Sequence, residues 1–310
     1  MRIAVVGIGA LGSLFAGYLA RCGEDVSGVD VQPEIISAIR ESGVRIREPE
    51  GEEIAIPLRV ALRPEEIGQM DLVIFLTKSG QTRGAAQSAR CLFGDETVAL
   101  TLQNGLGNPE AIGSILGEER VLVGVTNQGS TLLKPGSILH GGRGETVIGE
   151  IRGTRSERVD QIASAFNRAG FPAQVSAEIR NDVWGKLIVN VGINALTAIT
   201  RLRNGVLVER PETREILRRA VEETTRVADQ KGVRLPHEDA VKKVEDVCRA
   251  SKANFSSMLQ DVLQRRETEV DFINGAVVRE GEKLGVETPV NRLLTALVKT
   301  LEKTYAERAE

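Results

Sequence analysis

The sequence is poor in residues on which several common kinds of functional site depend. Its three cysteines, Cys22, Cys91 and Cys248, are far apart and odd in number, so they form neither a metal-binding spacing nor a disulfide framework. We therefore expect no metal site and a reducing cytosol as the environment. Only two histidines occur, which leaves few positions for a histidine-based mechanism. Of these, His140 in Leu-His-Gly-Gly-Arg is expected to be structural.

The chain also has no large excess of charge of either sign. Its 310 residues include 40 basic and 43 acidic side chains, for a net charge of −3. This balance favours neither a nucleic-acid partner nor an acidic membrane surface. No apolar run approaches the roughly 20 residues of a membrane span. Because a core strand begins at residue 2, we expect no signal peptide and a cytoplasmic location. The oligomeric state stays open, with a homodimer among the outcomes that the sequence allows.

The first part of the chain alternates short apolar runs with helical patterns. The runs typical of buried strands are residues 2–6, 25–30, 71–77, 97–102, 121–126, 146–151 and 172–175. Helical stretches lie between several of them, and the first of these ends at Gly23. This alternation predicts a Rossmann-type, doubly wound α/β sheet. Residues 43–62 contain two short alternating runs around Glu50-Gly51, which predict a hairpin added to one edge of the sheet.

The second part of the chain lacks strand patterns and is predicted to be helical throughout. Its helices are interrupted near Asn204-Gly205, Gly232–Pro236 and Gly285–Pro289. At the last of these breaks, Thr288 is expected to be an N-cap and Pro289 the first helical residue. The length of 310 residues suffices for two separate cores. We therefore expect two domains, an α/β domain over residues 1–177 and an all-helical domain over residues 178–310.

A glycine-rich sequence between the first strand and the first helix predicts dinucleotide binding. It reads Gly7-Ile8-Gly9-Ala10-Leu11-Gly12. Gly7 permits a tight turn, Gly9 lets the backbone approach a pyrophosphate, and Gly12 lets the helix pack closely on the strand. The start of the helix faces the phosphates. A glycine-rich turn that binds no ligand is the alternative.

Asp30, at the end of the second strand, bears on the choice of cofactor. A carboxylate about 20 positions after the glycines accepts hydrogen bonds from a ribose 2′-hydroxyl and repels a 2′-phosphate. The next residues, Val31-Gln32-Pro33, supply no cation. The residues thus favour NADH over NADPH. Lys78 and Asn104 follow two other strands at their carboxyl ends, where ligands of open α/β sheets bind. The alternative for Lys78 is a solvated loop lysine.

Three polar side chains interrupt an otherwise apolar helical stretch in the second domain. Lys186, Asn190 and Asn194 stand at i, i+4 and i+8, so they lie on one face of a helix whose other residues are mostly Leu, Ile and Val. Burying an ammonium group and two amides without partners costs several kcal/mol in order of magnitude. The pattern predicts a substrate site, with an internally satisfied polar network as the alternative.

The combined motifs resemble the ketopantoate reductase (2-dehydropantoate 2-reductase) family over essentially the full chain. Beyond the glycine-rich turn they are Thr77-Lys78, Gln103-Asn104-Gly105, Trp184-Gly-Lys186-Leu-x-x-Asn190-x-x-x-Asn194-x-Leu-Thr-Ala, Ser256-Ser-Met-Leu-Gln-Asp261 and Thr268-Glu-Val-Asp-Phe-Ile-Asn-Gly275. The resemblance implies NAD(P)H-dependent reduction of 2-dehydropantoate to pantoate, a step of pantothenate and coenzyme A biosynthesis. The substrate is then a small 2-keto acid. The family's usual cofactor is NADPH, whereas many members place an arginine where this chain has Asp30-Val31.

The resemblance also implies a role for individual residues. Lys186 is the general acid, and Glu269 contacts the substrate and orients Lys186. Asn190 and Asn194 hold the hydroxyl and carbonyl end of the substrate, and Ser257 binds its carboxylate. Lys78 and Asn104 line the nicotinamide side of the site, and Asn104 also contacts the substrate.

Elementary chemistry agrees with the role of the lysine. Hydride addition to a ketone builds negative charge on oxygen, and a nearby acid must supply a proton. A desolvated lysine is a natural donor, because burial lowers its pKa. Without the resemblance, Ser257 and Glu269 would be interpreted as ordinary helix surface. Two other functions stay open: a related dehydrogenase of another 2-keto or 3-hydroxy acid, and a non-enzymatic dinucleotide sensor.

Overall fold

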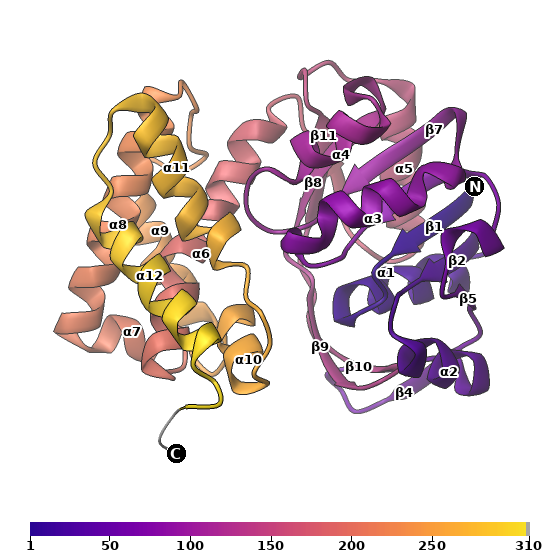
Figure 1. Cartoon of the computed structure of the whole chain (residues 1–310), viewed down its shortest axis with the longest axis horizontal. Helices are drawn as coiled ribbons and strands as arrows, with labels where there is room; N and C mark the ends of the chain where they lie inside the picture. The colour runs from indigo at the N-terminus through magenta and orange to yellow at the C-terminus, as the bar shows by residue number, and fades with distance from the viewer. Residues whose placement is uncertain (308–310) are drawn as a thin grey trace. The chain divides into compact units, whose positions relative to one another are not determined.

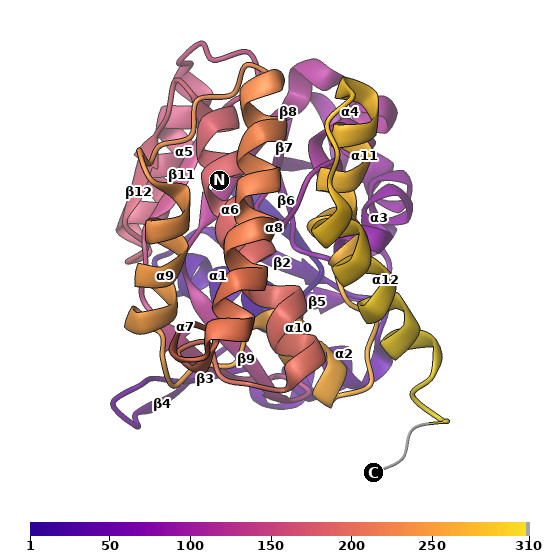
Figure 2. The ribbon, with the colours of Figure 1, turned by 90° about the vertical axis from the view of Figure 1, so that its left-hand side faces the viewer.

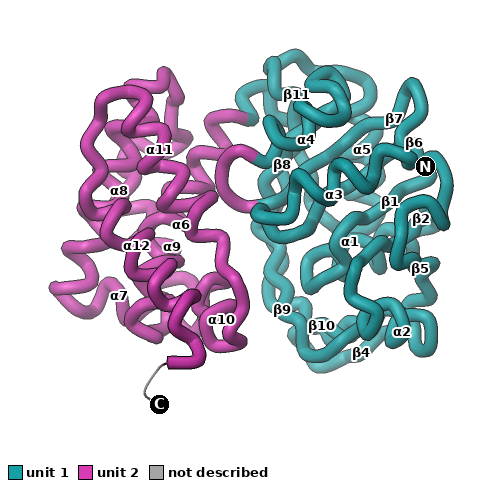
Figure 3. The backbone as a smooth tube through the Cα atoms, in the orientation of Figure 1, with its two compact units in different colours: residues 1–103, 108–179 teal, residues 104–107, 180–310 magenta. Residues whose placement is uncertain are grey.

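The structure, a computed structural model, describes residues 1–307. Its contacts divide the chain into two compact units. Unit 1 comprises residues 1–103 and 108–179, and unit 2 comprises residues 104–107 and the chain from Arg180 onward (Figure 3). Residues 104–107 thus belong to the helical unit, although they lie within the range predicted for the α/β domain.

Unit 1 is built on an eight-stranded sheet with the order β12-β11-β8-β7-β6-β1-β2-β5 (Figure 1). Its strands are β1 (Arg2–Val6), β2 (Asp25–Val29), β5 (Arg59–Ala61), β6 (Met70–Phe75), β7 (Phe93–Thr101), β8 (Val121–Thr126), β11 (Thr146–Glu150) and β12 (Ala173–Val175). Neighbouring strands are parallel from β8 to β5, whereas β11 runs antiparallel to β8 and parallel to β12. Each of the seven predicted runs forms a strand of this sheet.

Helices cover both faces of the sheet. One face carries α1 (Ala10–Arg21), α2 (Pro33–Ser42) and α5 (Glu157–Arg168), and the other carries α3 (Thr82–Ser88) and α4 (Asn108–Leu116). Short 3-10 turns lie at Pro64–Glu66, Ser79–Gln81, Ala89–Leu92 and Glu118–Arg120. Along β1, Ile3 and Val5 enter the core with α1, whereas Ala4 and Val6 enter the core with α3. This alternation is the period of a strand buried on both sides, and it confirms the predicted doubly wound fold.

A second sheet of four strands covers the side of α1 that faces away from the main sheet. Its order is β4 (Glu53–Ile56), β3 (Val44–Arg47), β10 (Ser137–Gly142) and β9 (Gly129–Lys134). The predicted hairpin exists as β3–β4, but its placement on the edge of the main sheet was wrong, because β5 occupies that edge beside β2. Helix α1 buries every residue from Gly12 to Gly17, so it needs apolar cover on this side too. A Cβ atom on Gly17 would lie 3.1 Å from Ile46 of β3.

His140 of β10 has the structural role that the sequence predicted. It is 3% exposed, with Nδ1 3.0 Å from Oε2 of Glu48 and Nε2 3.1 Å from Oε1 of Gln128. Glu48 also accepts hydrogen bonds from Tyr18 of α1 and from Arg143. This cluster ties the second sheet to α1 through buried polar groups that satisfy one another.

Unit 2 is helical, as predicted. Its elements are α6 (Ile179–Thr200), α7 (Val206–Glu209), α8 (Pro211–Gln230), α9 (Ala240–Ala250), α10 (Ser257–Leu263), the 3-10 turn η5 (Val270–Phe272), α11 (Asn274–Leu284) and α12 (Pro289–Lys303). The predicted breaks separate α6 from α7, α8 from α9 and α11 from α12. Helix α8 packs against α9, α11 and α12 (Figure 2). On α6, a Cβ atom at Gly192 would lie 2.7 Å from Val244 of α9, so the glycine permits close packing of the two helices.

The start of α12 is capped differently from the prediction. Pro289 is at the first helical position, but Thr288 makes no side-chain capping bond. The carboxylate of Glu223 on α8 instead accepts the N–H groups of Val290 at 2.8 Å and Asn291 at 2.9 Å. A carboxylate at a helix N-terminus satisfies free N–H groups and interacts favourably with the helix dipole. Tertiary packing brought this carboxylate from 67 residues away.

Helix α6 qualifies on length and composition as a membrane span, contrary to the expectation that no apolar run is long enough. Among residues 1–307 it is the one helix that does so. However, 67% of its most apolar window is buried, and Leu187, Ile188 and Val191 belong to the core of unit 2. Its hydrophobicity is therefore accounted for by internal packing.

Candidate functional site

The glycine-rich turn of unit 1 has the shape that the sequence predicts. Gly7 has a φ of +90°, and a Cβ atom there would lie 2.6 Å from the backbone nitrogen of Thr77. At Gly12, a Cβ atom would lie 1.9 Å from the carbonyl oxygen of Gly7. Gly9 differs, because a Cβ atom there would meet nothing within 4 Å. Gly7 and Gly12 are therefore required by the fold, whereas the open space at Gly9 is suited to a ligand.

The remaining residues of this turn line the start of α1. Ile8 is buried, Ala10 is the first residue of the helix, and Leu11 follows on its first turn. The hydroxyl group of Ser130 in β9 donates to the carbonyl oxygen of Ala10 at 3.0 Å. Free N–H groups at such a helix start bind phosphate groups.

Asp30 follows β2 directly and is 9% exposed. Its Oδ2 atom accepts the N–H of Ile8 at 2.9 Å, and its Oδ1 atom accepts the N–H of Gln32 at 3.0 Å. Burial raises the pKa of this carboxyl group, and the backbone hydrogen bonds oppose that effect. The contact with Ile8 fixes the carboxylate beside the glycine-rich turn, where the ribose of a dinucleotide lies in this fold.

Lys78 lies in a loop held by side-chain hydrogen bonds at the carboxyl ends of β6 and β7. The amide nitrogen of Gln103 donates to the carbonyl oxygen of Thr77 at 2.7 Å and to the hydroxyl of Thr82 at 2.8 Å. Asn108 accepts from Thr82 at 2.8 Å. Lys78 is partly buried between these anchored neighbours. Gln103, predicted only as part of the Gln103-Asn104-Gly105 motif, thus holds the loop that carries Lys78.

In unit 2, α6 carries Lys186 on the face that the four-residue spacing predicts. Lys186 is partly buried, and burial lowers its pKa to about 8. The carboxylate of Glu269 acts in the opposite direction and raises the pKa of Lys186. Glu269 is 7% exposed and accepts a hydrogen bond from Nδ2 of Asn104 at 3.3 Å. A lysine that is still protonated at neutral pH, yet is a stronger acid than usual, is suited to proton donation.

Two further amides on α6 have hydrogen-bonding capacity to offer a ligand. Asn194 is 5% exposed and Asn190 is partly buried. Within residues 1–307, neither side-chain amide makes a hydrogen bond. Because other groups among residues 1–307 do not satisfy the two amides, their donors and acceptors are available to a ligand on the face of Lys186.

Ser257, the predicted carboxylate contact, is exposed at the first position of α10. The preceding Ser256 is 6% exposed and is the N-cap of this helix, since its hydroxyl accepts the N–H of Leu259 at 3.0 Å. The structure therefore gives the two adjacent serines different positions. Only the tertiary structure separates the buried cap from the accessible hydroxyl.

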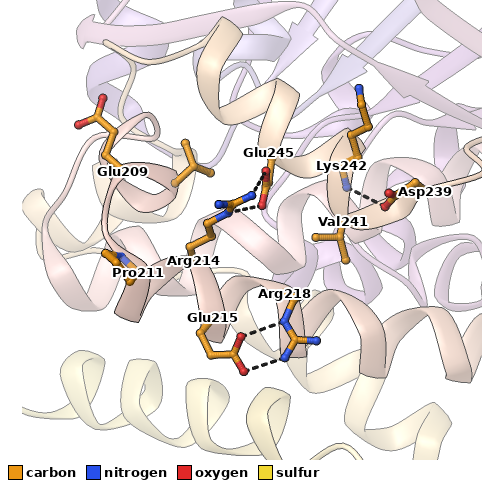
Figure 4. A pocket seen from close by; sticks show the side chains of 10 residues that line it. Glu209, Pro211, Arg214, Glu215, Arg218, Asp239, Val241, Lys242 and Glu245 are labelled. Carbon is orange, nitrogen blue, oxygen red and sulfur yellow. Dashed lines mark hydrogen bonds and ion pairs between the residues drawn. The ribbon is translucent and has the colours of Figure 1, made fainter.

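A groove of about 610 Å³ lies elsewhere in unit 2, beside α7, α8 and α9 (Figure 4). Its lining includes none of the predicted site residues. Arg214 and Glu245 pair across it at 2.6 and 2.9 Å, and Arg218 pairs with Glu215 at 2.7 Å. Because these charged groups pair with one another, they are not available to bind a ligand. Within residues 1–307, no cluster of side chains is suited to a metal ion.

Family models match both parts of the chain. Residues 3–153 match the model of the family described as ketopantoate reductase PanE/ApbA, and residues 178–302 match the model of its C-terminal domain. The 2-dehydropantoate 2-reductase of Halobacterium salinarum is 39% identical over 98% of this chain and 99% of its own length. The enzyme of the same name from Vibrio cholerae is 35% identical over 99% of this chain and 100% of its own length.

Solved structures with the same architecture match nearly the full length of the chain. A PanE/ApbA family ketopantoate reductase from Ralstonia eutropha has a TM-score of 0.91 and 32% identity, and the match covers 99% of this chain and 100% of that one. The ternary structure of D-mandelate dehydrogenase with NADH and anilino(oxo)acetate has a TM-score of 0.92 and 29% identity, with 99% and 100% covered. The two family models match in order along the chain, and a full-length relative is 39% identical to it, so the chain belongs to the ketopantoate reductase family.

Proposed function

We propose that the protein reduces 2-dehydropantoate to pantoate with NADH or NADPH, and thus serves pantothenate and coenzyme A biosynthesis. The observation that carries this proposal is the constellation on α6: Lys186 with a pKa of about 8 beside two amides that have no partner among residues 1–307. Its family relatives support the choice of substrate, since full-length relatives bear the name 2-dehydropantoate 2-reductase.

Lys186 acts as the general acid. When bound, NADH or NADPH would supply the hydride for the ketone carbon. The ketone oxygen gains negative charge as this happens, and the Nζ ammonium of Lys186 donates the proton that makes it a hydroxyl group. Because the pKa of Lys186 is about 8, the group is mostly protonated at pH 7 and gives up its proton more readily than an exposed lysine. Burial lowers the pKa of Lys186, and the negative charge of Glu269 opposes this effect by stabilising the ammonium form.

The other polar residues of unit 2 hold the substrate. Asn190 and Asn194 each offer an amide donor and acceptor, which suits the hydroxyl and carbonyl oxygens of ketopantoate. Ser257 donates its hydroxyl to the carboxylate. Asn104 contacts the substrate beside Glu269, to which it is hydrogen-bonded at 3.3 Å.

Unit 1 supplies the cofactor site. The residues present fit a dinucleotide: the space at Gly9 accepts a pyrophosphate, and the carboxylate of Asp30 suits a ribose with a free 2′-hydroxyl. Lys78 lies on the nicotinamide side. We favour NADH over the family's usual NADPH, and the solved structure of D-mandelate dehydrogenase with NADH is consistent with that preference.

A second candidate is a dehydrogenase of another 2-keto or 3-hydroxy acid, which the likeness to D-mandelate dehydrogenase favours. Steady-state assays of the purified protein with ketopantoate, phenylglyoxylate and unbranched 2-keto acids, each with NADH and NADPH, separate the candidates. The highest kcat/KM is expected for ketopantoate. A clear preference for phenylglyoxylate would select the second candidate, and absence of turnover with every acid would favour a dinucleotide sensor. We also propose a cytoplasmic location, with a homodimer as one assembly to test by light scattering.

A further inference from the structure

A chain of buried hydrogen bonds links α6 to the start of α10. The Oγ1 atom of Thr197 on α6 lies 2.7 Å from the Oγ atom of Ser256. The same Oγ1 atom lies 2.9 Å from the backbone carbonyl oxygen of Ile193 and 3.0 Å from that of Asn194. Ser256 immediately precedes Ser257 in the sequence. Two proposed substrate contacts, Asn194 and Ser257, are thus separated by a single pair of hydroxyl groups.

The donors and acceptors around this pair determine which hydroxyl group donates in each hydrogen bond. The N–H of Leu259 donates to Oγ of Ser256, and a carbonyl oxygen on α6 only accepts. Every atom is satisfied when Ser256 donates its proton to Thr197 and Thr197 donates to the backbone of α6. The start of α10 is therefore connected to the backbone of α6 at Ile193 and Asn194.

Both hydroxyl groups are buried, unlike the serine that follows them. Thr197 is 0% exposed and Ser256 is 6% exposed, whereas Ser257 is open to solvent. Removal of one hydroxyl leaves the other without its partner in a buried position, which is unfavourable. Neither hydroxyl is placed to touch a substrate, so any effect on substrate must act through Ser257 or Asn194.

We infer that Thr197 and Ser256 are positioning residues that fix the carboxylate-binding Ser257 relative to the substrate-binding Asn194. This inference rests on the proposed function, in which both contacts hold a 2-keto acid. The pair acts on binding of the carboxylate end, whereas Lys186 acts on proton transfer at the ketone. Loss of the pair therefore raises KM more than it lowers kcat.

The test compares Thr197→Val, which removes the hydroxyl at nearly constant shape, with Thr197→Ser, which keeps it. Thr224→Val is the matched control, because Thr224 is also 0% exposed and donates to a carbonyl four residues back at 2.8 Å, but within α8 alone. For each variant, KM and kcat for ketopantoate, the Kd of pantoate by calorimetry and the Tm are measured. We expect Thr197→Val to raise KM and Kd about 5- to 30-fold. Thr197→Ser and Thr224→Val should stay near wild type in both.

Ser256→Ala is a second, independent test if the Thr197→Val variant does not fold. The double variant should raise KM little more than either single variant, because both remove the same link. Wild-type KM and Kd in folded Thr197→Val or Ser256→Ala protein would overturn the inference, as would a Thr197→Ser variant as impaired as Thr197→Val. Lack of ketopantoate turnover by the wild-type protein would instead overturn the proposed function.

Discussion

The side-chain amide of Asn104 donates a hydrogen bond to Oε2 of Glu269 at 3.3 Å, joining residues 165 positions apart. The segment around Asn104 is held by a backbone bond of 2.9 Å from the N–H of Leu106 to the carbonyl oxygen of Phe272. Residues 104–107 therefore belong to the helical unit although the chain on both sides of them belongs to unit 1. This small segment places an amide beside the carboxylate that acts on Lys186.

Gly105 should be sensitive to the addition of a single methyl group. Its φ is +82°, and a Cβ atom would lie 2.3 Å from the carbonyl oxygen of Phe272. Gly105→Ala should displace the segment and lower kcat/KM by up to about 100-fold, the scale of a misplacement of about 1 Å. Gly107→Ala is the control, because its φ of +96° is equally strained but a Cβ atom there meets nothing within 4 Å. Equal losses in both variants would assign the effect to backbone strain alone.

Replacement of Glu269 should change the pH dependence of the reaction. Because the Glu269 carboxylate raises the pKa of Lys186, Glu269→Gln should move that pKa below about 8. The protonated lysine then disappears at lower pH, so the alkaline decline of kcat/KM for ketone reduction should shift toward neutrality. Glu269→Ala should damage catalysis and leave the Tm almost unchanged. A large loss of Tm with normal activity per folded molecule would assign Glu269 a structural role.

Lys186→Ala should lower kcat by about 10²- to 10⁴-fold, the usual contribution of a general acid. Binding of NADH, followed by its fluorescence, should change little. In the wild-type protein, reduction needs the protonated lysine and should decline above pH 8, whereas oxidation of pantoate needs the neutral lysine and should rise through the same pH. Near-wild-type turnover of the variant at neutral pH would rule out the acid role.

The two glycines that flank the start of α1 should respond to alanine in different ways. Gly9→Ala should fold normally, since a Cβ atom there meets nothing within 4 Å, but it should weaken NADH binding at least tenfold by occupying the space for the pyrophosphate. Gly12→Ala should lower the Tm, because its Cβ atom would lie 1.9 Å from the Gly7 oxygen. Unchanged NADH affinity in folded Gly9→Ala protein would contradict the assigned cofactor site.

Asp30 should make the enzyme prefer NADH. Two charges about 4 Å apart interact by about 1 kcal/mol in water and by more where solvent is reduced, so a 2′-phosphate should lower kcat/KM by at least about fivefold. Asp30→Ser should shift the ratio of kcat/KM values toward NADPH, whereas Glu34→Ser, an exposed acid on α2, should not. A wild-type preference for NADPH that survives Asp30→Ser would show that the carboxylate does not set the choice.

The features that the sequence determined by itself are local ones. The apolar runs predicted seven strands, because a strand that is buried on both faces of a sheet needs apolar side chains at successive positions. The face shared by Lys186, Asn190 and Asn194 follows from the helix repeat over nine residues. Glycine and proline predicted the breaks between the helices of unit 2. Each of these depends only on how a short segment of backbone orients its own side chains.

Tertiary structure decided the features that depend on distant segments meeting. No strand was predicted at residues 129–142, yet β9 and β10 form there because β10 pairs with both β9 and β3 in the second sheet that covers α1. Glu223 replaced Thr288 as the cap of α12, and Asn104 joined Glu269. The periodicity of a sequence does not reveal such pairs, because each partner residue is ordinary within its own segment. Their free energy comes from contacts that exist only once the packed surfaces have met.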